Sequence, residues 1–200
     1  MPTTQAAEGL ARRRFTTREL EAMAVAGILA DDERIELIAG EVVPMSPQGN
    51  RHEIIRTRLA HALSRSVTDK VRVSSEPQFN VSDDTHYVPD IFNHAADIDA
   101  PFVTGPEALH VIEIADTSLA YDLSRKATLY SLAGVREYWV IDAEKLITHV
   151  HRKPREATYA EIETCAVDQS ISAQFVPALV FSLSSLDLPW ADDGNGTPHG

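Results

Sequence analysis

The chain has 200 residues, 44% of them apolar, with one cysteine and a formal net charge of −12 from 30 acidic and 18 basic residues. This length and apolar content suffice for one well-formed core, and a single cysteine excludes an internal disulfide framework and a cysteine-based metal cluster. The acidic balance argues against loose binding to polyanions, although a cleft built from carboxylates is acidic until it binds a metal. We expect a single domain over residues 15–190.

Both ends of the chain are polar. The N-terminal segment has no apolar core of signal-peptide length, and no window approaches the roughly 20 apolar residues of a membrane span. We therefore expect a flexible leader over residues 1–14, a disordered tail over 191–200, and a cytoplasmic protein with no membrane partner.

Helical and strand patterns alternate along the chain. Thr16 and Glu19 form a capping box, which predicts a first helix from about Thr17 to Leu29. The elements expected after it, in chain order, are a β-hairpin over 35–45, a helix of about 18 residues capped by Asn50, strands over 71–75 and 78–81, a strand over 87–92, a strand over 109–114, a helix over 121–133 closed by Gly134, a hairpin over 137–152, and strands over 157–164 and 179–183. This order predicts an α/β fold, a mixed sheet flanked by helices.

Two carboxylates stand in otherwise apolar strand segments. Glu113 lies within Leu109–Ala115, and Asp90 lies between Tyr87-Val-Pro and Ile91-Phe92. An isolated buried carboxylate is costly unless it is protonated, paired with a cation or bound to a metal. Taken singly, each acid could equally be a strand-end residue or one paired with arginine. Two acids on neighbouring strands together favour a site for Mg²⁺ or Mn²⁺.

Lys126 is the candidate cation, on the helix that follows the Glu113 strand. Asp122 and Tyr130 lie four residues to either side of it, on one helical stripe. The residues alone favour an exposed Asp122–Lys126 ion pair.

Two acids with a lysine suit phosphodiester hydrolysis, because a metal activates water and the phosphoryl group while a fixed cation offsets charge developing in the transition state. Glu41 and His52 could reach the same cleft from the hairpin and the second helix, as metal ligands, orienting groups or proton-transfer groups.

Several segments in combination resemble the Uma2 family of restriction endonuclease-like proteins, over about residues 16–152. They are RIELIAGEVVPMSP at 34–47, His52, Val-Pro-Asp ending at Asp90, VIEIADTSLAYD at 111–122, Lys126, and AGVREYWVID at 133–142.

The resemblance implies a PD-(D/E)xK nuclease whose lysine has moved from the strand to the following helix, with a restriction-endonuclease-like fold. Asp90, Glu113 and the backbone carbonyl of Ile114 would then bind Mg²⁺ or Mn²⁺, and Lys126 would be the catalytic lysine. Glu41 and His52 match an acidic residue and a histidine of the family.

The function expected from these features is a metal-dependent DNA endonuclease. Double-strand cleavage needs two sites, an analogy that favours a homodimer. The net charge of −12 and the absence of lysine and arginine from the loop after Asp90 keep two alternatives open. These are an inactive interaction module with a nuclease fold, and a metal-dependent hydrolase of small phosphate esters.

Overall fold

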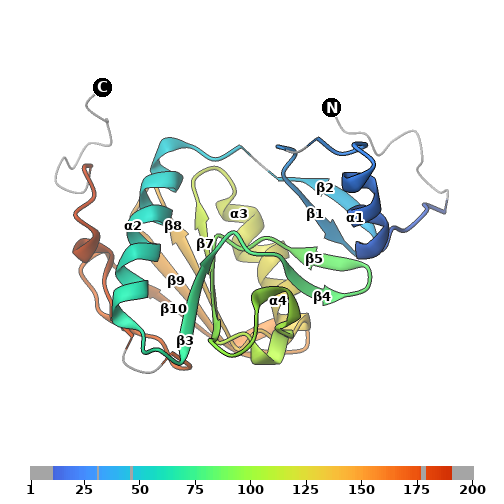
Figure 1. Ribbon diagram of the computed structural model, residues 1–200. Coiled ribbons are helices and arrows are strands. Elements are labelled where there is room, and N and C mark those ends of the chain that lie inside the picture. The colour runs from blue at the N-terminus through green and yellow to red at the C-terminus, as the bar shows by residue number, and fades with distance from the viewer. Residues whose placement is uncertain (1–10, 31, 46, 177–178, 191–200) are drawn as a thin grey trace. The chain divides into compact units, whose positions relative to one another are not determined.

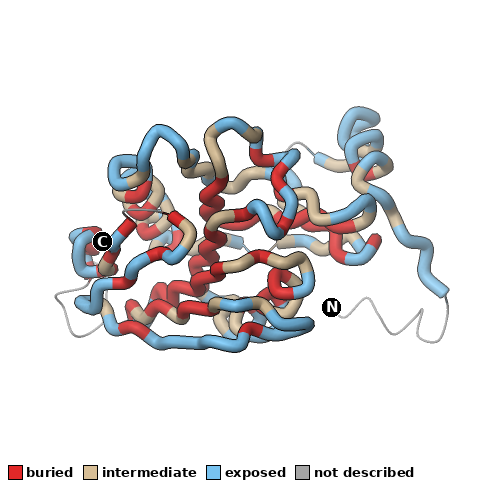
Figure 2. The backbone as a smooth tube through the Cα atoms, turned by 90° about the horizontal axis from the view of Figure 1, so that it is seen from below, coloured by how far each residue is buried: buried red, intermediate tan, exposed pale blue. Residues whose placement is uncertain are grey.

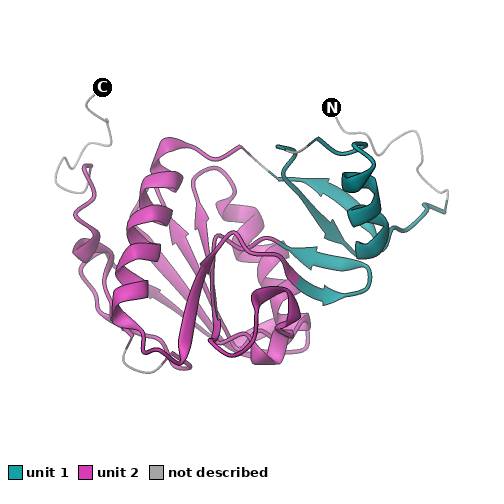
Figure 3. Cartoon of the chain, viewed as in Figure 1, with its two compact units in different colours: residues 1–45, 80–87 teal, residues 46–79, 88–200 magenta. Residues whose placement is uncertain are grey.

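A computed structural model describes residues 11–30, 32–45, 47–176 and 179–190. The predicted tail and residues 1–10 of the predicted leader lie outside these ranges. The contacts divide the chain into two units (Figure 3), one formed by residues 1–45 and 80–87 and the other by residues 46–79 and 88–200. We call them unit 1 and unit 2. The expected single domain over residues 15–190 stays a prediction.

Unit 1 contains one helix and a four-stranded sheet. The predicted capping box of Thr16 and Glu19 is present at the start of α1 (Thr17–Val25). The helix ends before the predicted Leu29 because Gly27 adopts a left-handed φ of 68°. The strands are β1 (Ile35–Ile38), β2 (Glu41–Pro44), β4 (Phe79–Ser82) and β5 (Thr85–Tyr87), in the order β2-β1-β5-β4.

The predicted hairpin of unit 1 is confirmed. Strands β1 and β2 pair antiparallel, with Ile38 opposite Glu41. Ala39 and Gly40, the two residues between them, have φ values of 51° and 79°. Positive φ at both positions is typical of the tight turns that match the twist of paired strands.

Unit 2 contains a six-stranded sheet in the order β10-β9-β8-β7-β6-β3 (Figure 1). The described neighbours pair antiparallel except β7 with β8, which are parallel. This is the expected mixed sheet. Its strands are β3 (Val71–Ser75), β6 (Ile91–Ala95), β7 (His110–Ala115), β8 (Glu137–Asp142), β9 (Ile147–Arg155) and β10 (Thr158–Cys165).

Helical segments flank this sheet. The first is α2 (Asn50–Ser66), capped by Gly49 rather than by the predicted Asn50. A helix runs between the parallel strands as α3 (Leu119–Tyr121), a π-helical turn (Asp122–Lys126) and α4 (Ala127–Leu132). Parallel neighbours need such a crossover. The remaining elements are the 3₁₀ turns Ala100–Phe102, Gly105–Glu107 and Leu183–Leu186, and the short strands β11 (Ile171–Ser172) and β12 (Val180–Phe181).

Side-chain alternation gives the two faces of the sheet different partners. Ile112 and Ile114 of β7 belong to the apolar cluster that also contains Ile55, Leu59 and Leu63 of α2. Val111 and Glu113 therefore point to the other face. Every residue of β7 and of β8 is buried, and buried positions are red in Figure 2. Glu113 thus lies in the middle of the sheet and away from bulk water.

No helix in the described part of the chain combines the length and the apolar character needed to cross a membrane.

Candidate active site

Asp90 lies at the point where the chain enters β6. The predicted strand over 87–92 is wrong in detail, because β6 begins only at Ile91. Proline at position 89 lacks the N–H that a sheet ladder needs. Ile91 pairs with Ile112, so continuing the antiparallel register by one residue brings Asp90 opposite Glu113. Residues opposite each other in such a pair project from the same face.

The Asp90 carboxylate is only 3% exposed and has fixed partners. Its Oδ2 accepts a hydrogen bond of 2.7 Å from the backbone N–H of Ile114. The same oxygen lies 2.9 Å from Nε2 of His52, which is also buried. Gln48 Nε2 approaches Oδ1 at 3.4 Å. The Asp90 side chain therefore accepts a backbone hydrogen bond from β7 at the position just before β6 begins.

The Glu113 carboxylate is held from the crossover helix. Its Oε1 accepts hydrogen bonds from Nζ of Lys126 at 2.8 Å and from the hydroxyl of Tyr130 at 2.7 Å. Lys126 is 7% exposed. The prediction of an exposed Asp122–Lys126 pair is wrong, since both side chains are buried. The Asp122 carboxylate also accepts from the hydroxyl of Ser118.

The π-helical turn contributes to this arrangement. Asp122 and Lys126 are its two buried residues, and Lys126 is also the last residue before α4. A π turn adds one residue to a helical turn and is frequent at functional sites. It rotates the residues after it relative to α3, and the Lys126 and Tyr130 side chains reach the same oxygen of Glu113.

Charged side chains of α2 extend the polar network beyond Asp90. Arg56 pairs with Glu53 at 2.7 Å and with Glu76 at 3.4 Å, and Gln48 donates to Glu76 at 3.0 Å. Burial alone would lower the pKa of Arg56, but the Glu53 hydrogen bond and the charges of Glu76 and Asp90 outweigh it and raise this pKa. Hydrogen bonds from Arg56 lower the pKa of Glu53.

Two other residues, Ile114 and Glu41, were also predicted to belong to the site. Ile114 is buried on β7, and its N–H is already used by Asp90. Glu41 lies on β2 in unit 1, where its half-exposed side chain pairs with Arg12 at 3.3 Å. The structure thus brings Asp90, Glu113, Lys126 and His52 into one polar region of unit 2, and the role of Glu41 stays a prediction.

The donor set of this region suits a hard divalent cation. Among the described residues, no three His, Cys, Asp or Glu side chains gather at a metal-sized site. Two carboxylates and a backbone carbonyl are nevertheless oxygen ligands of the kind that Mg²⁺ prefers, with water completing the shell. Both carboxylates are oriented by hydrogen bonds from neighbouring groups, as metal ligands commonly are.

Comparison with known families identifies the relationship. The model of the Uma2 family, described as "Putative restriction endonuclease", matches residues 18–185. The chain is a member of the Uma2 family. The crystal structure of a "putative nuclease belonging to DUF820" from Anabaena variabilis matches with a TM-score of 0.60 and 19% identity, over 76% of this chain and 88% of that one. No curated protein matches the sequence.

These findings fix the fold of this Uma2 protein as restriction-endonuclease-like, in agreement with the sequence resemblance. At 19% identity, the solved structure shows the fold alone.

Three residues of the site were missed by the sequence reasoning. Gln48 and Arg56 flank His52 at positions that looked like an ordinary loop and an ordinary exposed helical face. Tyr130 was noted only as an apolar partner of Lys126. The signal that could have found Tyr130 is its spacing, since residues four apart on a helix meet on one face.

Proposed function

We propose that this Uma2 protein is a DNA endonuclease that hydrolyses phosphodiester bonds with Mg²⁺ or Mn²⁺. The observation that carries the proposal is the pairing of two buried acids in one sheet register, with a buried lysine on one of them. Asp90 and Glu113 directly adjoin the paired residues Ile91 and Ile112, and Lys126 Nζ lies 2.8 Å from Glu113. The family description and the fold support a nuclease.

In the proposed site, Asp90, Glu113 and the carbonyl of Ile114 hold the divalent ion. Such an ion, when bound, polarises a phosphoryl oxygen and makes a bound water more acidic. The ammonium of Lys126 offsets the charge that develops on the phosphate in the transition state. His52 keeps Asp90 in place through its contact with Oδ2.

The test is cleavage of supercoiled plasmid in Mn²⁺ or Mg²⁺ by the full chain. We expect nicking that stops when EDTA is added. Asp90→Asn and Glu113→Gln should each lower the rate at least about 100-fold, because each removes a charged metal ligand while keeping the side-chain shape.

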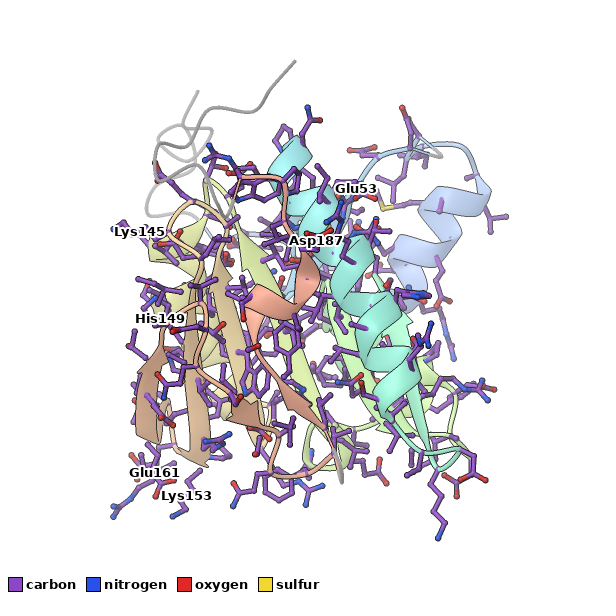
Figure 4. The ribbon with its side chains drawn as sticks, turned by 90° about the vertical axis from the view of Figure 1, so that its left-hand side faces the viewer. Glu53, Lys145, His149, Lys153, Glu161 and Asp187 are labelled. Atoms are coloured by element: carbon purple, nitrogen blue, oxygen red, sulfur yellow. The ribbon has the colours of Figure 1, made fainter. Side chains whose placement is uncertain are left out.

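A matched control is Glu161→Gln, the same change on β10. Figure 4 labels Glu161 beside Lys153, at the opposite end of the sheet from Glu53 on α2. Glu161 is half exposed and pairs with Lys153 on the surface. The Glu161→Gln variant should nick plasmid at the same rate as the unchanged protein. Nicking that survives both Asp90→Asn and Glu113→Gln would reject the assigned site.

The net charge of −12 favours a second candidate, a hydrolase of small phosphate esters. A long DNA duplex meets more of the acidic surface than a small ester does. Metal-dependent turnover of bis(p-nitrophenyl) phosphate without plasmid nicking would favour this candidate. Both activities should depend on Asp90 and Glu113 if one site performs them.

A further inference from the structure

Tyr130 shares an oxygen of Glu113 with Lys126. The Tyr130 hydroxyl and the Lys126 ammonium both donate to Oε1, at 2.7 Å and 2.8 Å. All three side chains are nearly inaccessible, with exposed fractions of 1% for Tyr130, 7% for Lys126 and 4% for Glu113. A hydrogen bond to a buried carboxylate is stronger than one at the surface, and its loss leaves an acceptor that water cannot reach.

The ring of Tyr130 is fixed by its neighbours. Its centroid lies 4.9 Å from that of Tyr138 and 6.5 Å from that of Phe79. Tyr138 lies on β8 and Phe79 is the last residue of unit 2 before the chain enters unit 1, and the two rings confine the phenol on the face of the sheet that carries Glu113. The hydroxyl is therefore held at a defined place, unlike the end of a flexible lysine side chain.

The two donors respond differently to a metal. A divalent cation near Glu113 repels the ammonium of Lys126, because like charges a few ångströms apart raise the energy of both. The hydroxyl of Tyr130 is neutral, so the cation does not repel it as it repels the ammonium. The Tyr130 hydroxyl can therefore still hold Oε1 when the ammonium turns toward the phosphate.

We propose that Tyr130 is the positioning residue of the metal ligand Glu113, and that it leaves Lys126 available to act on the substrate. This inference rests on the proposed metal-dependent function. It assigns to Tyr130 a role through Glu113, without contact to the substrate.

The test measures Mn²⁺ affinity rather than cleavage, by electron paramagnetic resonance of free Mn²⁺ in titrations of the full chain. Tyr130→Phe should weaken Mn²⁺ binding about 10-fold, the usual cost of removing a group that orients a metal ligand. The matched control is Tyr159→Phe. Tyr159 is also buried, but its hydroxyl donates to the carbonyl of Val135 at 2.8 Å. This control should bind Mn²⁺ like the unchanged protein.

A rescue distinguishes positioning from packing. Para-aminophenylalanine at position 130 keeps an N–H donor at the place of the hydroxyl and should restore Mn²⁺ affinity, whereas para-methylphenylalanine, of similar size, should not. If Tyr130→Phe does not fold, the comparison of these two substituted proteins tests the inference in its place.

The outcomes separate the inference from the function on which it rests. Equal Mn²⁺ affinities for Tyr130→Phe, Tyr159→Phe and the unchanged protein would overturn the role of Tyr130 and leave the nuclease proposal standing. Absence of Mn²⁺ binding by the unchanged protein would overturn both. A selective loss at position 130 with rescue by the amine would support both.

Discussion

At the scale of single residues, burial decides which groups carry charge, and His110 is the clearest case. It is fully buried on β7, where its ring centroid lies 4.2 Å from that of Trp139 in a T-shaped arrangement and its Nδ1 lies 3.1 Å from Asn93 Nδ2. Burial lowers the pKa of His110 to about 4, although the charge of Glu137 partly opposes this. His110 is therefore neutral in the folded protein at neutral and mildly acidic pH.

This depressed pKa makes stability depend on pH. The unfolded chain binds a proton at His110 below its ordinary pKa of 6.5, whereas the folded chain binds one only near 4. Stability is therefore lost as the pH falls from 6.5 toward 4. We expect His110 to remove about 2 kcal/mol of unfolding free energy between pH 7.5 and pH 5.

Urea denaturation at these two pH values measures the effect. His110→Gln cannot gain a proton, so its unfolding free energy should fall less between them. An identical pH dependence in both proteins would show that His110 is not the group responsible.

The sequence identified some site residues because their chemistry conflicts with their surroundings. Asp90 and Glu113 are charges in apolar runs, and their burial beside partners is what such a conflict predicts. Lys126 came from the family resemblance, since the residues alone favoured an exposed ion pair. Tyr130 was not assigned because a tyrosine on the buried stripe of a helix is most often an ordinary core residue.

At the scale of elements, the presence of a helix or strand was easier to predict than its first and last residues. Most helices and strands up to β10 lie close to their predicted positions, because apolar periodicity and turn residues mark them, but β5 was not predicted as a strand. The π-helical turn was not predictable, since Asp122–Lys126 satisfies the spacing of an ordinary α-helix. The entry to β6 was misplaced because a run with proline inside it still has the apolar character of a strand.

One buried ion pair connects several elements of unit 2. Glu137 of β8 is fully buried and accepts hydrogen bonds from Trp139 Nε1 at 3.1 Å, Arg152 Nε at 2.8 Å and the backbone N–H of Gln174 at 2.6 Å. Arg152 of β9 also donates to the carbonyl of Ser172 at 2.6 Å. The pair thereby fixes the chain after β10 to the sheet.

We expect Arg152→Met to lower the unfolding free energy by about 3–5 kcal/mol, because it leaves the buried Glu137 charge without its cation. Chemical denaturation gives the value. Lys153→Met is the control, since Lys153 and Glu161 pair at the surface (Figure 4) and such pairs contribute about 0–1 kcal/mol. Equal losses for the two variants would contradict the role of the buried pair.

At the scale of the whole molecule, the charge of −12 constrains how DNA can bind. Two polyanions repel each other, and cations between them reduce the repulsion. We expect the affinity for a duplex to be at least about 10-fold higher in Ca²⁺ than in EDTA, because the divalent ion bridges the two negatively charged surfaces. Fluorescence anisotropy with a labelled duplex measures both affinities. Equally tight binding in EDTA would mean that a basic surface, rather than a metal, attracts the DNA.

The division into two units also determines how the gene can be modified. The chain passes between the units three times, at residues 45–46, 79–80 and 87–88, because residues 80–87 belong to unit 1. Removing unit 1 therefore takes more than an N-terminal truncation, since residues 80–87, which contain β5 and most of β4, would have to be replaced as well. The last crossing is followed two residues later by Asp90, so any shortening of the returning strand changes the spacer in front of a proposed metal ligand. An insertion at the turn between β4 and β5 would also disturb unit 1, because the carbonyls of Asp83 and Asp84 accept hydrogen bonds from the backbone N–H groups of Thr17 and Gly40.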